Sequence, residues 1–188
     1  MDIEPSLKDD RRIQILDAAT ELLAIKPTAS LAEIATHAHI GKATLHRYFA
    51  NREALLVELA YRALALISEA IVACRLDEDS APVALARVAE TLIPLGDKLY
   101  FLLNEHIWDV HQDLALAEQA VNAPVMRLIE RGQAEGTFRR DISATWMMYQ
   151  LDFTMYAAWQ AIHDGNIARR EASRLIMDTL LGGIATKP

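Results

Sequence analysis

The segment from residue 42 to residue 48 carries side chains suited to reading a nucleic acid. Its sequence, KATLHRY, combines two cations, an imidazole, two hydroxyls and a methyl group, and contains no acid. Such groups can donate hydrogen bonds to phosphates and base edges, or contact a thymine methyl, from a helix in the DNA major groove. The candidate contacts in this segment are Lys42, Ala43, Thr44, His46, Arg47 and Tyr48.

The apolar residues around this segment have the spacing of a helix-turn-helix. Ile34 and Ala38 would line the inner face of a first short helix, and Ile40 would fill the turn. Leu45 and Tyr48 would anchor the second helix. The alternative is a helical hairpin of an ordinary all-α core, but such a hairpin gives no reason for an exposed second helix that is short, basic and free of acids.

The residues at the starts of two helices add further candidate contacts. Ser30 and Glu33 form the S-x-x-E capping box, in which each side chain bonds a backbone N–H of the first turn. Helix N-termini also attract phosphate, so we expect Thr28 and Ser30 either to contact DNA or to cap the helix only. Asn51 caps the next helix, and Arg52 beside it is a candidate phosphate contact.

The stretch from residue 11 to residue 56 resembles the N-terminal domain of tetracycline-repressor (TetR) family regulators. The resemblance rests on ILDAATELLA for a first helix, SLAEIA for a second, KATLHRYF for a recognition helix and NREALL at the start of a long fourth helix. It implies a homodimer that binds a palindromic operator in double-stranded DNA. It also implies a C-terminal domain for a small apolar or amphipathic effector, whose binding in the common family mode releases a repressor from DNA.

The turn between the two short helices departs from the family pattern. His39 stands where the family usually has Gly, Gly41 where it often has Ser, and His46 where it commonly has Tyr. The turn would place residue 39 in the left-handed backbone region, where a residue with a Cβ atom is strained. Gly41 can occupy the N-cap position of the second helix. It has no hydroxyl, so it cannot accept a hydrogen bond from the backbone N–H groups of the first turn.

The composition predicts an all-α protein of about nine helices. Hydrophobic residues make up 52% of the 188-residue chain, which has only 7 Gly and 6 Pro. We expect an N-terminal helix-turn-helix domain over residues 1–56 and an effector-binding and dimerisation domain over residues 57–188. Beyond the two short helices, helices are expected near residues 10–25, 52–74, 82–94, 97–110, 114–132 with a bend or interruption at Pro124, 143–163, and 167–181 before Gly182-Gly183.

The charge balance is acidic and predicts weak nonspecific DNA binding. The whole chain has a net charge of −7, and residues 1–60 hold seven Lys and Arg against nine Asp and Glu, a net charge of −2. Between residues 34 and 52, however, there are three Lys and Arg and no acid. Because salt screens charges beyond about 10 Å, phosphates would respond mainly to this local patch.

Aromatic and methionine side chains are concentrated after Leu99. Such residues suit an adaptable apolar pocket, and an ordinary core with a dimer seam is the alternative. Further polar residues that could orient a ligand are Asn104, Gln112 and Asp152. The candidate ligand-binding residues are Trp108, His111, Trp146, Tyr149, Gln150 and Phe153.

The last two helices are candidates for the homodimer seam. Phe153, Ala157 and Ala161 recur at helical spacing, and small residues let helices approach closely. The residues that would join them from the last helix are Leu175, Ile176, Met177, Leu180 and Leu181. Packing within one chain is the alternative use of these two faces.

Other classes of protein find little support. The chain has no nucleophile elbow, glycine-rich phosphate loop or spaced metal ligands, so we expect no enzyme, cofactor or metal. His106, Asp109 and His111 do not share one helix face. One cysteine, Cys74, and no apolar run of membrane-spanning length favour a cytoplasmic protein without a membrane partner. The alternative function is an all-α interaction protein that has lost DNA binding.

Overall fold

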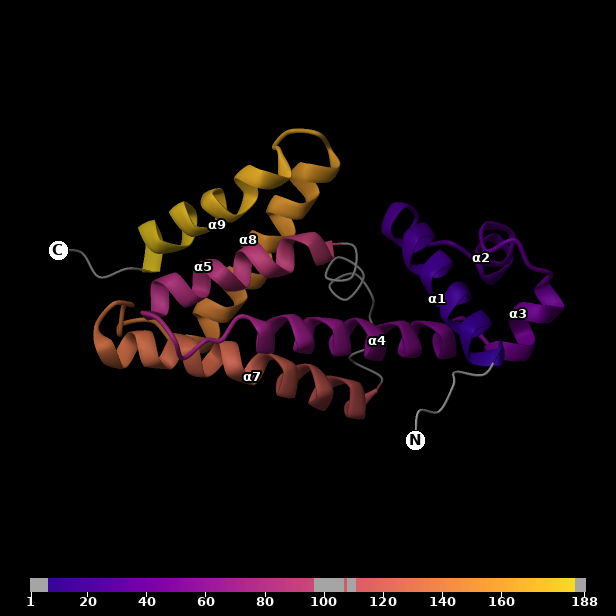
Figure 1. The fold of residues 1–188 in the computed structure, drawn as a ribbon, viewed down its shortest axis with the longest axis horizontal. Coiled ribbons are helices and arrows are strands. Elements are labelled where there is room, and N and C mark those ends of the chain that lie inside the picture. Colours follow the sequence, from indigo (N-terminus) through magenta and orange to yellow (C-terminus); the bar gives the residue numbers. More distant parts are fainter. Residues whose placement is uncertain (1–6, 97–106, 108–110, 185–188) are drawn as a thin grey trace. The chain divides into compact units, whose positions relative to one another are not determined.

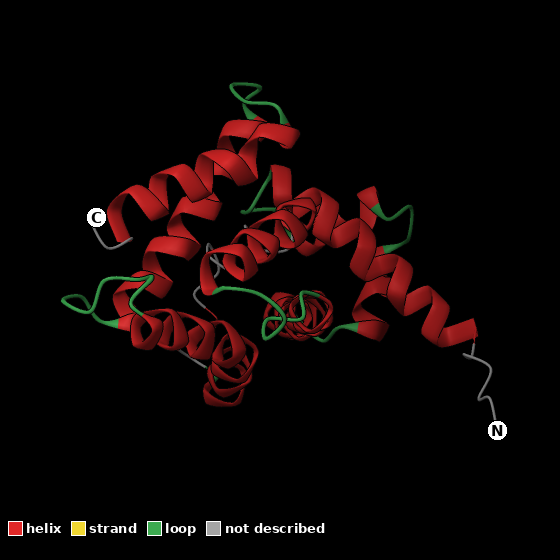
Figure 2. Ribbon diagram, turned by 60° about the vertical axis from the view of Figure 1, so that its left-hand side comes forward, coloured by secondary structure: helices red, strands yellow, loops and turns green. Residues whose placement is uncertain are grey.

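The computed structural model describes residues 7–96, 107 and 111–184, and all regular elements there are helical (Figures 1 and 2). They are α1 (Leu7–Ile25), α2 (Leu31–His37), α3 (Lys42–Tyr48), α4 (Arg52–Ala73), α5 (Ala81–Leu92), η1 (Ile93–Leu95), α7 (Gln112–Glu135), α8 (Ala144–His163) and α9 (Arg169–Ile184). The predicted all-α class is confirmed. The described residues form eight α-helices and one 3-10 turn, close to the nine helices expected.

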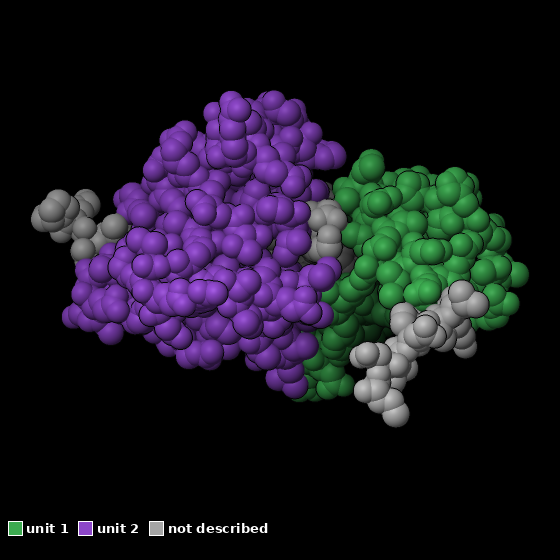
Figure 3. Space-filling view, viewed as in Figure 1, with its two compact units in different colours: residues 1–63, 97–115 green, residues 64–96, 116–188 purple. Residues whose placement is uncertain are grey.

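The chain divides into two compact units, which Figure 3 distinguishes by colour. The first comprises residues 1–63 and 97–115, and the second comprises residues 64–96 and 116–188. Helices α4 and α7 each have one end in the first unit and the other in the second. The boundary predicted at residue 56 lies within α4, and the division into domains 1–56 and 57–188 stays a prediction.

The first unit is built on the apolar face of α1. Ile15, Ala19 and Leu23 are buried at i, i+4 and i+8, and α1 packs against α2. Helix α1 ends at Ile25, just before Lys26-Pro27, because the residue preceding a proline is disfavoured in the helical conformation.

The turn between α2 and α3 closes through backbone hydrogen bonds. The Ile40 N–H donates to the Ala35 carbonyl at 2.9 Å, and the His39 N–H donates to the Thr36 carbonyl at 3.1 Å. These two bonds define a Schellman motif, which requires a left-handed residue directly after the C-cap residue. His39 occupies that position with φ 53°, so the predicted left-handed conformation is confirmed.

The second unit packs α9 against both α5 and α8 (Figures 1 and 2). Ala172, Ile176 and Leu180 are buried along α9 at i, i+4 and i+8. Gly96 follows η1 and lies against the Trp159 indole of α8, so closely that a Cβ atom at Gly96 would be 1.4 Å from Trp159 Cδ1. A glycine at residue 96 therefore allows the aromatic ring to pack.

Several predicted helix boundaries were wrong. Helix α1 begins at Leu7 rather than Asp10, and α7 extends from Gln112 to Glu135 without interruption at Pro124. Helix α9 begins at Arg169 rather than Ile167 and continues through Gly182-Gly183 to Ile184. Glycine weakens a helix but keeps its N–H donor, so it does not by itself end one. The helix expected over 97–110 lies outside the described residues, apart from Ile107.

Candidate nucleic-acid interface and ligand site

Helices α2 and α3 are fixed by a small buried cluster. Ile34 and Leu45 are buried, as the apolar spacing predicted, and Ala35 is buried beside them. Ala38 and Ile40, expected on the inner face and in the turn, are half-buried. Helix α2 packs against both α1 and α3. Tyr48 was expected to anchor α3, but it is half-buried, and Phe49 one residue later is the buried aromatic. Phe49 lies after the helix end in extended backbone, so helical periodicity did not identify it.

The outer face of α3 presents the predicted contact residues. Lys42, Ala43, His46 and Arg47 are exposed, and Thr44 is half-buried. Lys42 and His46 form no hydrogen bond or ion pair with other described residues, so both are available to an external partner. The Arg47 guanidinium lies 5.7 Å from the centre of the Tyr48 ring, within the range of a cation–π contact.

The capping box at the start of α2 is confirmed. The Glu33 N–H donates to Ser30 Oγ at 3.3 Å, and the Ser30 N–H donates to Glu33 Oε2 at 2.9 Å. Glu33 also accepts a hydrogen bond from Lys26, which together with Ser30 lowers the pKa of the Glu33 carboxyl to about 2. Thr28 is exposed beside this helix end. The roles of Thr28 and Ser30 as phosphate contacts stay predictions.

Arg52 connects α4 to the loop before α2. Its Nε donates to the Ala29 carbonyl at 3.2 Å, and one of its terminal nitrogens donates to the Pro27 carbonyl at 2.7 Å. Asn51 caps α4, since its side-chain oxygen accepts a hydrogen bond from the Ala54 N–H at 2.8 Å. The structure thus shows Arg52 positioning the loop that carries Thr28, and its phosphate contact remains a prediction.

Two arginines in the first unit neutralise acids between α1 and α4. Arg12 donates to both carboxylate oxygens of Glu58 and lies 5.0 Å from the centre of the Phe49 ring. Arg62 forms an ion pair with Asp17 at 2.6 Å. Both acids therefore have partners within the fold.

The candidate ligand-binding residues of α8 lie on its surface. Trp146 and Tyr149 are each 54% exposed, and Phe153 is 61% exposed. An enclosed pocket would bury such side chains, so their exposure does not favour the predicted ligand role. Gln150 is half-buried, and Trp108 lies outside the described residues.

His111 lies in the first unit, in contact with α4. Its Nε2 is 2.8 Å from Glu53 Oε1, although the two residues are 58 positions apart in sequence. The partner of His111 in the described structure is thus an acid in the first turn of α4. The sequence had instead indicated that His111 would contact a ligand.

Two half-buried carboxylates, Glu118 on α7 and Asp152 on α8, interact electrostatically in the second unit. Burial, with a smaller contribution from the Glu118 charge, raises the pKa of Asp152 to about 7, and burial raises the pKa of Glu118. Neither carboxylate has a hydrogen bond or ion pair with another described residue. Burial of a carboxylate without a counter-charge disfavours its ionised form, which is why both pKa values are raised.

Asp152 was predicted from the sequence as a polar residue that could orient a ligand, whereas Glu118 was not predicted. The available signal was helical phase, because Glu118 lies at i+4 from the buried Leu114 and at i−7 from the buried Val125. An acid within an apolar stripe is unusual unless it has a partner. Among the described residues, no three His, Cys, Asp or Glu side chains gather as metal ligands would.

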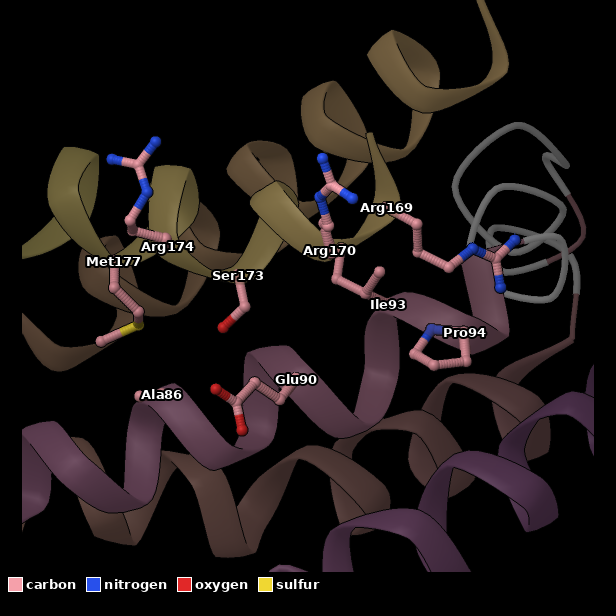
Figure 4. A pocket seen from close by; sticks show the side chains of 9 residues that line it. All are labelled: Ala86, Glu90, Ile93, Pro94, Arg169, Arg170, Ser173, Arg174 and Met177. Carbon is pink, nitrogen blue, oxygen red and sulfur yellow. The ribbon is translucent and has the colours of Figure 1, made fainter. Parts of the chain in front are cut away.

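A separate groove of about 700 Å³ lies between α5 and α9 (Figure 4). The Ser173 hydroxyl and the Glu90 carboxylate face one another across it, and arginines extend along its α9 side. Arg169 and Arg170 form no hydrogen bond or ion pair with described residues. The residues that line the groove are Ala86, Glu90, Ile93, Pro94, Arg169, Arg170, Ser173, Arg174 and Met177. The arginines on its α9 side distinguish this groove from the site of the two carboxylates Glu118 and Asp152.

No described helix has the combined length and apolar character that crossing a bilayer requires.

Comparison with known proteins agrees with the helix-turn-helix geometry. Residues 15–59 match the family model for bacterial regulatory proteins of the tetR family. The chain is 34% identical to the HTH-type transcriptional repressor LfrR of Mycolicibacterium smegmatis, over 99% of this chain and 96% of that protein. It is 28% identical to the HTH-type transcriptional regulator NfxB of Pseudomonas aeruginosa, over 93% of each chain.

Comparison with solved structures also shows similarity to LfrR. The crystal structure of LfrR from Mycobacterium smegmatis in complex with proflavine superposes with a TM-score of 0.82 at 30% identity. The match covers 97% of this chain and all of that one. The chain therefore belongs to the TetR family of bacterial regulatory proteins, whose members are DNA-binding transcriptional regulators.

Proposed function

We propose that this protein is a ligand-responsive repressor that binds a palindromic operator as a homodimer and is released by a small effector. The observation that carries the DNA-binding half is the outer face of α3, where exposed Lys42, His46 and Arg47 occur within a stretch free of acids. The repressor half is supported by the 34% identity to LfrR, which is named a transcriptional repressor.

The DNA contacts divide into two classes in this proposal. Phosphates are contacted by Lys42 and by the groups beside the starts of α2 and α4, namely Thr28, Ser30 and Arg52. Base edges and thymine methyls are contacted by the exposed residues of α3. The residues assigned to this second class are Ala43, Thr44, His46, Arg47 and Tyr48.

The DNA-binding half is tested by selecting bound duplexes from a random pool. Symmetric sites with half-sites roughly 34 Å apart, or a small multiple of that, are expected. Lys42→Ala should weaken binding to all sequences and reduce the salt slope by about one, whereas Arg47→Ala should cost about 1–3 kcal/mol at one base position. Arg127→Ala, at an exposed arginine of α7, is the matched control. Absence of binding at every salt concentration would favour the interaction-protein alternative.

We propose that the exposed apolar face of α8 forms the centre of the homodimer seam. Trp146, Tyr149 and Phe153 recur at i, i+3 and i+7, and Ala157 continues the same exposed stripe. A contiguous exposed patch of large apolar side chains marks a protein interface in a soluble protein. The residues first assigned to a ligand pocket thus serve self-association, and α9 contributes its half-buried Leu175 and Leu181. Ile176, Met177 and Leu180, which were also expected in the seam, are buried within the chain and follow the alternative use of that face.

The seam is tested by sedimentation of charged variants. Phe153→Glu should convert the dimer to monomer, because it places a carboxylate in the apolar contact. Val72→Glu is the matched control, at an apolar side chain of α4 that is 74% exposed. A Phe153→Glu protein that stays dimeric would place the seam elsewhere.

We propose that the effector is an aromatic cation bound at Asp152 and Glu118. The supporting observation is the half-buried carboxylate pair without a protein counter-charge. A ligand cation would favour the ionised form of Asp152 and pair with both carboxylates. The inner face of α8, with Met148 and Met155, would place polarizable side chains beside an aromatic ring. A solved structure of LfrR contains proflavine, which is a planar aromatic cation.

Proflavine fluorescence titration tests the effector class. Asp152→Asn and Glu118→Gln should each weaken dye binding by about tenfold, the effect of losing one shielded charge contact. Arg170→Gln, in the groove between α5 and α9, is the control and should leave dye binding unchanged. Equal dye affinity in the wild type and both carboxylate variants would refute this assignment.

A further inference from the structure

The first turn of α4 contacts the residue that precedes α7. His111 Nε2 and Glu53 Oε1 are 2.8 Å apart, within hydrogen-bond distance, and the two side chains are 34% and 54% exposed. An exposed pair of this kind adds little to folding stability. It can therefore form and break in the folded protein without unfolding it.

The backbone of His111 couples its side chain to α7. The His111 carbonyl accepts hydrogen bonds from the Leu114 N–H at 3.0 Å and from the Ala115 N–H at 3.1 Å. The His111 N–H donates to the Ile107 carbonyl at 3.0 Å. His111 thus closes the first turn of α7, so its position follows any movement of this turn.

Helix α7 also carries one of the two carboxylates of the proposed effector site. Glu118 lies seven residues beyond His111, about two helical turns or roughly 10 Å along the axis. The helix is continuous from Gln112 to Glu135. A ligand cation that pairs with Glu118 therefore acts on the same continuous helix whose first turn His111 closes.

Glu53 is equally well connected to the DNA-binding helices. It follows Arg52, whose guanidinium bonds the Pro27 and Ala29 carbonyls of the loop that leads into the α2 capping box. The Asn51 side chain closes the same turn of α4. A shift of Glu53 would thus displace the start of α4 together with the loop before α2.

We propose that the His111–Glu53 pair transmits effector occupancy from α7 to the DNA-binding helices. His111 and Glu53 are positioning residues in this role, since they act through α7 and α4. The inference rests on the proposed function, because it requires an effector that lowers operator affinity. By linkage, the ratio of proflavine dissociation constants with and without operator duplex measures the coupling.

The test is a double-mutant cycle on that ratio, using proflavine and the duplex recovered by the pool selection. His111→Ala and Glu53→Ala should each reduce a wild-type ratio of five- to hundredfold toward one, and the double variant should reduce it no further than either single variant. His111→Gln retains a donor for Glu53 and should keep most of the coupling. His37→Ala breaks a comparable exposed pair with Glu21, at 3.5 Å, and should leave the ratio unchanged.

The possible outcomes separate this inference from the proposed function. A wild-type ratio above one that persists in His111→Ala would overturn the inference and leave the proposed function intact. Additive losses in the double variant would overturn it too, because the two side chains would then act independently. A wild-type ratio of one, with both ligands bound, would refute both, since there would be no coupling to transmit.

Discussion

Replacing His39 by glycine should stabilise the protein, because His39 occupies the left-handed position of the turn between α2 and α3. Its φ is 53°, and both hydrogen bonds of the Schellman motif are backbone bonds that glycine retains. The His39 side chain is exposed and forms no hydrogen bond or ion pair with described residues, so the substitution removes no contact with them.

The magnitude follows from two opposing effects. The left-handed conformation costs a residue with a Cβ atom roughly 1–2 kcal/mol. Glycine has more conformational freedom in the unfolded chain, and losing that freedom on folding offsets roughly 0.5–1 kcal/mol of the stabilisation. The net gain in the free energy of unfolding is therefore about 0.5–1 kcal/mol, which in a chain of this length raises Tm by about 1–4 °C.

Urea and thermal unfolding of His39→Gly, followed by circular dichroism, would measure this gain. Ala38→Gly is the matched control at the neighbouring C-cap, where φ is −75° and there is no strain to relieve. That control should lower the free energy of unfolding by about 0.5–1 kcal/mol. If His39→Gly were as destabilising as Ala38→Gly, the left-handed residue would carry no strain and the reasoning would be wrong.

Four further substitutions test other features of the fold. Gly96→Ala should cost about 1–3 kcal/mol of stability, because its Cβ would overlap the Trp159 indole. Gly182→Ala, with nothing within 4 Å of its Cβ, should be neutral or stabilising, and equal losses at both sites would contradict the packing argument. Since burial raises the folded-state pKa of Asp152 to about 7 from 3.8, wild-type stability should fall as pH rises from about 4 through 7. Asp152→Asn should make the urea midpoint less dependent on pH and should be more stable than the wild type at pH 8. Parallel curves of urea midpoint against pH for the two proteins would refute this prediction. Arg52→Ala should lower Tm and weaken binding to all duplexes alike, and a change confined to one base position would show direct readout instead.

The features that the sequence predicted well are those decided over a few residues. The Ser30–Glu33 capping box and the left-handed His39 both depend on backbone geometry within one turn. The burial of Ile34 and Leu45 follows from helical spacing in the same short motif. Local geometry of this kind is encoded by neighbouring residue types, so a single sequence is enough to identify it.

The ends of the longer helices were less predictable. Pro124 and Gly182 are both unfavourable inside a helix, yet α7 and α9 continue through them. The cost of such a residue is a few kcal/mol at most, and burial of neighbours such as Val125 and Leu180 opposes it. Local propensity therefore did not decide where these helices end.

The sequence alone determined that this protein is all-helical and that α3 presents a basic face free of acids. Periodicity also showed which residues of α8 share a face, but not whether another element covers that face. Tertiary structure decided that Trp146 and Phe153 lie at the surface and that Asp152 is close enough to Glu118 to feel its charge. It likewise brought His111 to Glu53 across 58 residues. Helical phase depends on local spacing, whereas contacts between distant helices depend on how the whole chain packs.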